Sequence, residues 1–267
     1  MDVRLWLVRV SILTLSVGFI SCGNRFDLDT ERGRRARIDE ANFFLSNGEC
    51  SRAHEAIDPL YGSAQHRTEE VVLIKASAYA CAGGYKMLTI AGNLAGASNV
   101  YKAFAKSMPN ALGDGKISAL YQALDVLTNS NTVLDAVNRG KDRNDYMIFL
   151  QLGVIGAILH AYGSPSADGT QGANLAYANP RVGTDMSNVD ACSLTVAMGV
   201  IVDSYPHSNL SDADSAAAKN ALSAACVAAG LGSCNVISRD RTSCDGTGGD
   251  PESVAASAVV TAVNNAW

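Results

Sequence analysis

The sequence has few of the residues on which enzymes and metal sites depend. Its 267 residues include four histidines, and aromatic residues make up 6%. It contains no GxSxG nucleophile motif, no HExxH zinc motif, no CxxC pair and no GxxxxGKS or GxxxxGKT phosphate loop. Without these arrangements a nucleophile, a metal ion or a nucleotide has no recognisable site. We therefore expect a protein that is not an enzyme and that holds neither a metal ion nor a cofactor.

Positive charge is not in excess either. The chain has 21 lysines and arginines against 26 aspartates and glutamates, for a formal net charge of −5. A mildly acidic chain has no electrostatic attraction to nucleic acid or to anionic lipid. The alternation of apolar and polar residues that marks β-strands is also missing, whereas apolar residues recur at helical spacing. These patterns argue against a nucleic-acid partner and predict an all-α fold.

The N-terminus is the most distinctive part of the sequence. Arg4 and Arg9 precede an apolar run over 10–20, and the small Ser21 then precedes Cys22. This order of positive charge, apolar stretch and small-residue cleavage site is typical of a secretory signal. The cysteine directly after the cleavage point resembles the lipobox of bacterial lipoproteins. The alternative is an ordinary cleaved signal peptide with an incidental cysteine.

The lipoprotein resemblance implies that residues 1–21 are a signal peptide and that Cys22 is acylated, for example with palmitate. Residues 22–33 are then expected to be a flexible tether, because they are polar. Gly23, in place of Asp, is similar to the pattern of lipoproteins that are passed to the outer membrane. The resemblance therefore implies a cell-envelope protein that is anchored by lipid to the outer membrane and faces the periplasm.

Six further cysteines remain if Cys22 carries lipid. An even set in an exported chain favours disulfide bonds, because the periplasm is oxidising. Sequence spacing alone does not choose among the possible pairings, and a set of free buried cysteines is the alternative. The candidates are Cys50, Cys81, Cys192, Cys226, Cys234 and Cys244.

The first helical segments of residues 34–162 repeat. Phe44 and Tyr79 are 35 residues apart, as are Gly48 and Gly83. Helix–turn–helix units with a period of about 34 residues resemble the tetratricopeptide repeat (TPR). The residues that match its pattern are Ala41, Phe44, Gly48, Cys50 and Ala53 in the first repeat and Ala76, Tyr79, Gly83 and Tyr85 in the second.

The TPR resemblance implies stacked helical hairpins whose concave surface binds an extended peptide or a partner helix. In such a stack the start of one helix B lies beside the end of the next helix A, so the resemblance implies a Cys50–Cys81 disulfide. It also implies partner-binding positions on helix A of each repeat, away from the packing positions. These positions are Asp39, Asn42 and Lys75.

The rest of the chain is predicted to be helical with one long interruption. Helices are expected over 99–107, 117–128, 131–139 and 142–162. The last of these is apolar on all sides, which is typical of a central core helix. Residues 163–185 are rich in Gly, Ser, Asn and Asp and are predicted to be a loop, either a solvated connector or a functional segment. Residues 186–267 are predicted to be an irregular helical region braced by disulfides.

These features together predict an interaction protein. The leading hypothesis is a lipid-anchored adaptor of the cell envelope that binds a protein or peptide partner through its helical-repeat surface. The alternative is a ligand-binding lipoprotein associated with a periplasmic solute transporter, in which the long apolar helix and the 163–185 loop line a cavity for a small ligand. Both hypotheses place the protein at the membrane through its N-terminal lipid.

Overall fold

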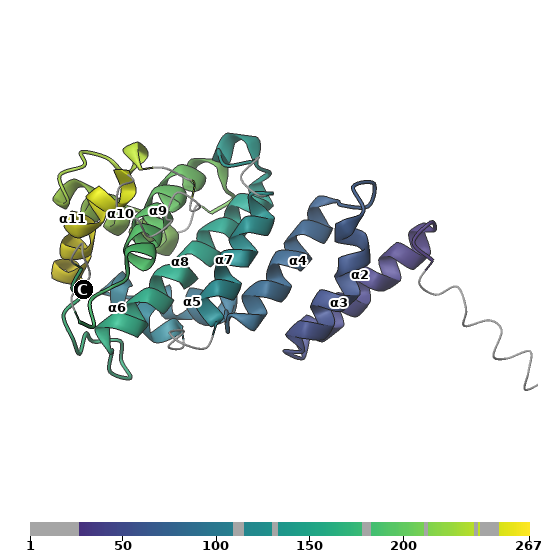
Figure 1. Cartoon of the computed structure of the whole chain (residues 1–267), viewed down its shortest axis with the longest axis horizontal. Helices are drawn as coiled ribbons and strands as arrows, with labels where there is room; N and C mark the ends of the chain where they lie inside the picture. Colours follow the sequence, from purple (N-terminus) through teal and green to yellow (C-terminus); the bar gives the residue numbers. More distant parts are fainter. Residues whose placement is uncertain are drawn as a thin grey trace, which may run out of the picture. The chain divides into compact units, whose positions relative to one another are not determined.

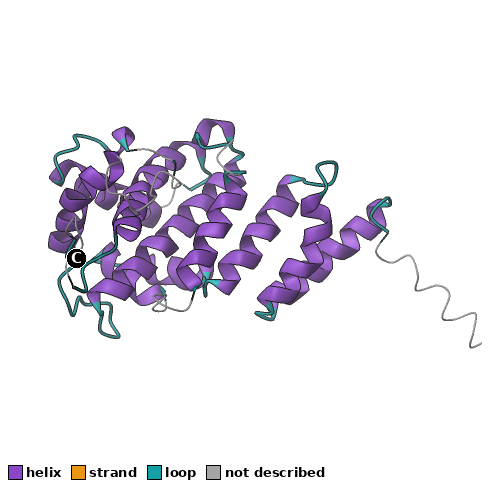
Figure 2. Ribbon diagram, in the orientation of Figure 1, coloured by secondary structure: helices purple, strands orange, loops and turns teal. Residues whose placement is uncertain are grey.

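A computed structural model of the chain describes residues 27–108, 115–129, 133–177, 183–210, 213–237, 240 and 251–267, without the side chains of 213–215 and 251–254. Within these residues every regular element is a helix and no strand occurs (Figure 2). The all-α prediction is therefore confirmed. The predicted signal peptide, the predicted lipidation site Cys22 and the candidate disulfide residue Cys244 lie outside the described residues.

The chain divides into two compact units, the first ending at Ile74 and the second beginning at Lys75. The first unit contains α2 (Glu31–Ser46), α3 (Cys50–Gly62) and the first turns of α4 (Glu69–Ala82) (Figure 1). The division falls inside the segment 34–162 that the sequence predicts as one repeat region.

The helices α2 and α3 form a hairpin because the sequence specifies a sharp end to α2. After Asn47, Gly48 adopts a φ of +71°, in the left-handed region that glycine tolerates. The backbone N–H groups of Gly48 and Glu49 then donate to the carbonyls of Leu45 and Phe44, which closes the helix end. The buried side chains of this hairpin are Ile38, Ala41 and Phe44 from α2 and Ala53, Ala56, Ile57 and Leu60 from α3.

The second unit contains the rest of α4 and seven further described α-helices. They are α5 (Met87–Leu94), α6 (Val100–Ser107), α7 (Lys116–Leu127), α8 (Lys141–Gly163), α9 (Asn188–Ser204), α10 (Ala213–Ala228) and α11 (Pro251–Ala266). Three short 3-10 helices join them: η1 (Ala136–Asn138), η2 (Tyr205–His207) and η3 (Cys234–Val236).

The long helix α8 lies at the centre of the second unit, with α6, α7 and α9 packed against it. It is also the one helix among the described residues that is long and apolar enough to cross a membrane, but 72% of its most apolar window is buried inside the structure. Burial against other helices, rather than against lipid, accounts for its apolar surface. The sequence prediction of a central core helix over 142–162 is confirmed.

The predicted helix over 131–139 is wrong for the residues that the structure describes. Only the three residues of η1 are helical there. The buried Arg139 side chain donates to the carbonyl oxygens of Val133 and Leu134 and to the Ser204 hydroxyl. The amide of Asn144 donates to further carbonyls in the same region. A buried side-chain network thus replaces the backbone hydrogen bonds that a longer helix would form.

The loop predicted over 163–185 contains no helix after Gly163 in its described residues, but its first part is not a solvated connector. The carbonyl of Gly169 accepts a hydrogen bond from the indole Nε1 of Trp267, at 2.9 Å. The side chain of Asn264 accepts from Gln171 Nε2 at 2.6 Å and from the backbone N–H of Leu175 at 2.7 Å. These contacts with the C-terminal end of the chain hold the loop against the second unit.

Disulfides are present, as the even cysteine set predicts. Cys226, in the last turn of α10, is bonded to Cys234 at the start of η3, and their Cα atoms are 5.4 Å apart. A cross-link over so short a loop stabilises the folded chain by about 2–3 kcal/mol in the chain-entropy account. Cys50, Cys81 and Cys192 are disulfide-bonded as well. The specific pairing of Cys50 with Cys81 stays a prediction.

Glycines in α8 permit the close approach of its neighbours. A Cβ atom added to Gly156 would lie 2.4 Å from the backbone oxygen of Phe104 in α6. Backbone atoms cannot move aside as a flexible side chain can, so only glycine fits at this crossing. In contrast, Gly92 in α5 has no atom within 4 Å of the position that a Cβ would take.

Three tyrosines of the second unit are shielded from water by their neighbours: Tyr101 is 2% exposed, and Tyr85 and Tyr146 are partly buried. Burial raises the pKa of Tyr101 and of Tyr146 to about 12, with a hydrogen bond to Ser77 partly offsetting the effect on Tyr146. Burial, and then the neighbouring Tyr146, raise the pKa of Tyr85 well above its ordinary value. Tyr85 and Tyr146 pack edge to face, with ring centroids 6.2 Å apart.

We predict that Gly156→Ala destabilises the second unit by about 2–4 kcal/mol, because α6 and α8 must move apart to admit the methyl group. Gly92→Ala is the matched control. We expect it to raise stability by about 0.5–1 kcal/mol, since alanine favours the helix and meets open space. Urea unfolding followed by circular dichroism measures both changes. Equal effects of the two substitutions would contradict the tight crossing at Gly156.

We also predict that stability falls as the pH rises from about 10 to about 12. The buried phenols keep their protons in the folded state, whereas the unfolded chain releases them from the ordinary tyrosine pKa upward. Stability is therefore fully present below pH 10, and a shift of this size corresponds to about 2–3 kcal/mol for one phenol. Melting temperatures between pH 8 and 12 measure the loss, which should be smaller in Tyr101→Phe. A melting temperature that does not change to pH 12 would refute it.

Candidate functional site

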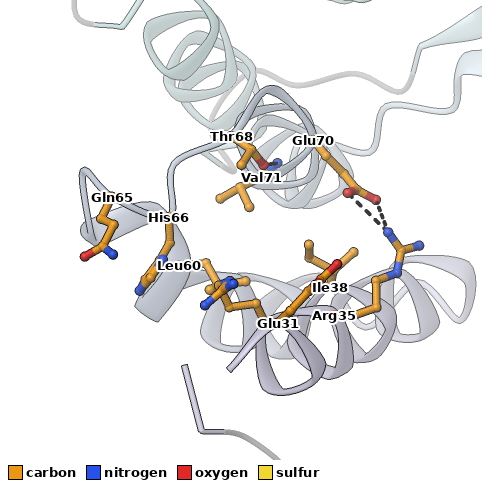
Figure 3. A pocket seen from close by; sticks show the side chains of 10 residues that line it. Glu31, Arg35, Ile38, Leu60, Gln65, His66, Thr68, Glu70 and Val71 are labelled. Atoms are coloured by element: carbon orange, nitrogen blue, oxygen red, sulfur yellow. Dashed lines mark hydrogen bonds and ion pairs between the residues drawn. The ribbon is translucent and has the colours of Figure 1, made fainter. Parts of the chain in front are cut away.

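The first unit has an open groove with a volume of about 450 Å³ (Figure 3). It runs between α2 and the first turns of α4, with the end of α3 and the connection 63–68 at one side. Cavities of about 300–1,000 Å³ are typical of sites for small ligands or for side chains of a partner. The groove is lined by Glu31, Arg34, Arg35, Ile38, Leu60, Gln65, His66, Thr68, Glu70 and Val71.

The floor of the groove is apolar. Val71 on α4 and Ile38 on α2 point toward each other across it, and Leu60 lies beside them (Figure 3). The exposed fractions of Ile38, Leu60 and Val71 are 7%, 1% and 1%. These side chains are held by packing below the groove, so the floor is already formed before any ligand arrives.

An ion pair bridges the groove between its two helices. The Arg35 guanidinium donates from Nη1 to both carboxylate oxygens of Glu70, at 3.0 and 3.3 Å. Its Nε also donates to Asp39 Oδ1 at 3.1 Å. Arg35 and Glu70 have side chains that are 57% and 46% exposed. An exposed pair of this kind contributes little to stability. It does neutralise the positive charge of Arg35, which is then less able to bind another anion.

Other polar groups on the groove have no such partner. Arg34 donates from Nη1 to the carbonyl of Leu28 at 2.9 Å. Among the described residues no carboxylate lies within ion-pair distance of its guanidinium, not even that of Glu31 one turn earlier. The side chains of Glu31, Gln65 and His66 likewise have no hydrogen-bond partner in the described part of the chain. In the described part of the chain, the groove therefore combines an apolar floor with polar side chains that no other residue engages.

The residues that the sequence predicts as partner-binding lie in different environments. Asp39 and Asn42 are exposed on α2, as expected, although Asp39 is paired with Arg35. Lys75, the first lysine in the chain, is only 3% exposed, and its Nζ lies 5.0 Å from the centroid of the Tyr79 ring. This burial contradicts its assignment to a solvent-facing surface. The charge of a lysine in an apolar helix predicts a solvent-exposed position, but the long aliphatic part of its side chain can pack among apolar neighbours.

Sequence reasoning missed Phe43, which is 61% exposed beside Asn42. Its ring packs edge to face on that of Phe44, with centroids 5.7 Å apart. A signal was available, because Phe43 falls outside the apolar face that Ile38, Ala41 and Phe44 define. An exposed aromatic next to polar residues is a typical composition for a protein-binding surface.

A second polar cluster, around Asp190, is explained by packing alone. The carboxylate of Asp190 accepts hydrogen bonds from the hydroxyls of Tyr162 and Ser187 at 2.6 Å each and from Tyr121 at 3.3 Å. Burial first, and then the hydrogen bond to Asp190, raise the pKa of Tyr162. The Ser187 hydroxyl in turn caps α9 by accepting from the backbone N–H of Asp190. This cluster joins α7, α8 and α9, and we assign it a structural role.

We predict that Arg35→Gln lowers the free energy of unfolding by about 1 kcal/mol or less, because the pair with Glu70 is exposed to solvent. The effect should shrink further in 1 M NaCl. Leu60→Ala, in the buried floor, is expected to cost about 2–5 kcal/mol. Urea titrations give the free energy of unfolding of both variants. They show whether the Arg35–Glu70 ion pair only lines the groove or also stabilises the unit. A larger loss for Arg35→Gln than for Leu60→Ala would contradict this assignment.

The chain was compared with protein families, curated proteins and solved structures. No family model, no curated protein and no solved structure matches it. The chain's own residues and their geometry are therefore the basis for proposing what it does.

Proposed function

We propose that the protein is a lipid-anchored adaptor of the cell envelope that binds a protein or peptide partner and performs no chemistry. The observation that carries the proposal is the groove of the first unit, where a buried apolar floor lies below polar side chains such as Gln65 and His66, which have no partner among the described residues. Stable recognition of a partner needs both parts: apolar contact supplies affinity, and polar contacts fix orientation.

Features of the hairpins support the TPR-like part of the proposal. Ala41 and Ala53 are fully buried, and Gly48 lies in the turn between α2 and α3. Gly83 also follows its helix, α4, directly, but the residue there with the left-handed backbone of Gly48 is Gly84, at a φ of +75°. The second hairpin departs from the family pattern because α5 has eight residues, against 13 in α3. We propose that the two hairpins are degenerate repeats whose surfaces present the binding residues.

Membrane attachment through Cys22 would keep the groove near the bilayer. Eight residues, and so nine Cα-to-Cα steps, separate Cys22 from Glu31, the first residue that lines the groove. Even fully extended, a chain of that length reaches about 30 Å. The partners within reach would be membrane proteins or proteins close to the membrane surface. We propose the periplasmic side of the outer membrane as the location, on the basis of the lipoprotein resemblance.

We predict that Cys22→Ser moves the protein from the membrane pellet to the soluble fraction, because the acyl chains would be its attachment. Fractionation of cells followed by intact-mass measurement checks this result. Cys50→Ser is the control for losing a cysteine without losing the lipid. A Cys22→Ser protein that still pellets with membranes would contradict the proposed lipid attachment at Cys22.

The adaptor is tested separately by photo-crosslinking in intact cells, with benzophenone placed at Asp39 in one variant and at Asn42 in another. We expect each benzophenone variant to yield a discrete crosslinked envelope protein, and we expect the yield to fall when Phe43→Ser is added and removes the exposed ring. Absence of any crosslinked partner from both positions 39 and 42 would overturn the adaptor.

A further inference from the structure

We propose that the groove of the first unit recognises an acidic peptide motif, in which a large apolar side chain lies next to a carboxylate. The apolar side chain would contact the floor, and the carboxylate would bind Arg34. This inference rests on the proposed adaptor function and names the chemistry of its partner.

The floor selects for an apolar side chain. Ile38, Leu60 and Val71 come from three different helices, and each is nearly fully buried by the packing of the unit. An aliphatic side chain of a partner that packs on this floor removes its own apolar surface from water, and the floor needs no rearrangement to receive it. A groove of about 450 Å³ has room for one or two such side chains, and not for a whole helix.

Arg34 selects for a carboxylate. A guanidinium has five N–H donors, and among the described residues Arg34 makes one donation, from Nη1 to the Leu28 carbonyl. That bond also orients the side chain, so less freedom is lost when a ligand arrives. The neighbouring Arg35 is unsuitable, because its charge is already shared between Glu70 and Asp39. A carboxylate can accept two parallel hydrogen bonds from a guanidinium, which is among the strongest polar contacts in proteins.

Two further groups assist the same ligand, and one opposes it. The side chains of Gln65 and His66 lie together at one end of the groove, away from the Arg35–Glu70 pair (Figure 3). Neither has a partner in the described residues, so both can donate to a peptide carbonyl or to a carboxylate. Glu31 is exposed at the rim and would repel an acidic ligand. Removing its charge should therefore strengthen binding rather than weaken it.

The test uses fluorescence anisotropy with labelled peptides and the full chain purified in detergent. Four peptides share a Gly-Ser framework and differ in a central pair: Leu-Glu, Leu-Gln, Leu-Lys and Ala-Glu. We expect the Leu-Glu peptide to bind at least tenfold more tightly than each of the other three. That difference corresponds to the loss of either the charge-assisted contact or the apolar contact.

Variants of the protein test the assigned contacts. Arg34→Gln should weaken binding of the Leu-Glu peptide about tenfold or more and leave the weak binding of the Leu-Gln peptide unchanged. Arg32→Gln is the matched control, since it removes the same charge from an exposed position of α2 that does not line the groove. Glu31→Gln should tighten binding of the Leu-Glu peptide, a gain that misfolding cannot produce. Circular dichroism checks that each variant is folded.

Several outcomes would overturn the inference. Tighter binding of the Leu-Lys peptide would show that the groove prefers a basic partner. Equal binding of the Leu-Glu and Leu-Gln peptides would show that the carboxylate contributes nothing to recognition. If 4-methylpentanoate alone competes as well as the whole peptide, the ligand is a small acid rather than a protein segment. If the benzophenone variants crosslink a partner in cells equally with and without Arg34→Gln, the adaptor proposal stands and only this groove chemistry is refuted.

Discussion

The packing of other helices against α8 is the constraint on which the second unit depends. This helix is apolar on all its faces, so it is soluble only when other helices cover it. The contact with α6 is close because Gly156 presents no side chain to the Phe104 carbonyl. Gly153 gives the Tyr85 ring a similar approach, since an added Cβ would lie 2.8 Å from that ring. The position of α8 thus fixes both α6 and the start of α5.

Local signals in the sequence were sufficient to predict the helices, but they did not predict the structure of the irregular segments between them. Asn47-Gly48 ends α2 through backbone geometry that depends on these two residues alone, so the turn could be predicted. The segment 131–139 could not, because its backbone follows Arg139 and its buried partner Ser204, which is 65 residues away. The loop before α9 is similar. Its composition predicts irregular structure, but its contacts with Asn264 and Trp267 are invisible until the chain folds.

The groove, too, could be predicted only in part from the sequence. Asp39 and Asn42 could be placed on an exposed helix face from their spacing along α2. The groove itself needs Ile38, Leu60 and Val71 from three helices, and no single segment contains its pattern. Whether Arg34 or Arg35 keeps a free charge depends on Glu70, which lies 35 residues farther along the chain. Only tertiary structure separates the paired arginine from the one that can bind.

The first unit has one further property that follows from its composition. The earliest lysine in the sequence is Lys75, and its ammonium group is buried. Reagents that couple to primary amines therefore have no lysine to react with on the surface that carries the groove. Crosslinking surveys that rely on such reagents would detect the second unit and leave the contacts of the first unrecorded. Light-activated or carboxyl-directed probes are the suitable choice for mapping its neighbours.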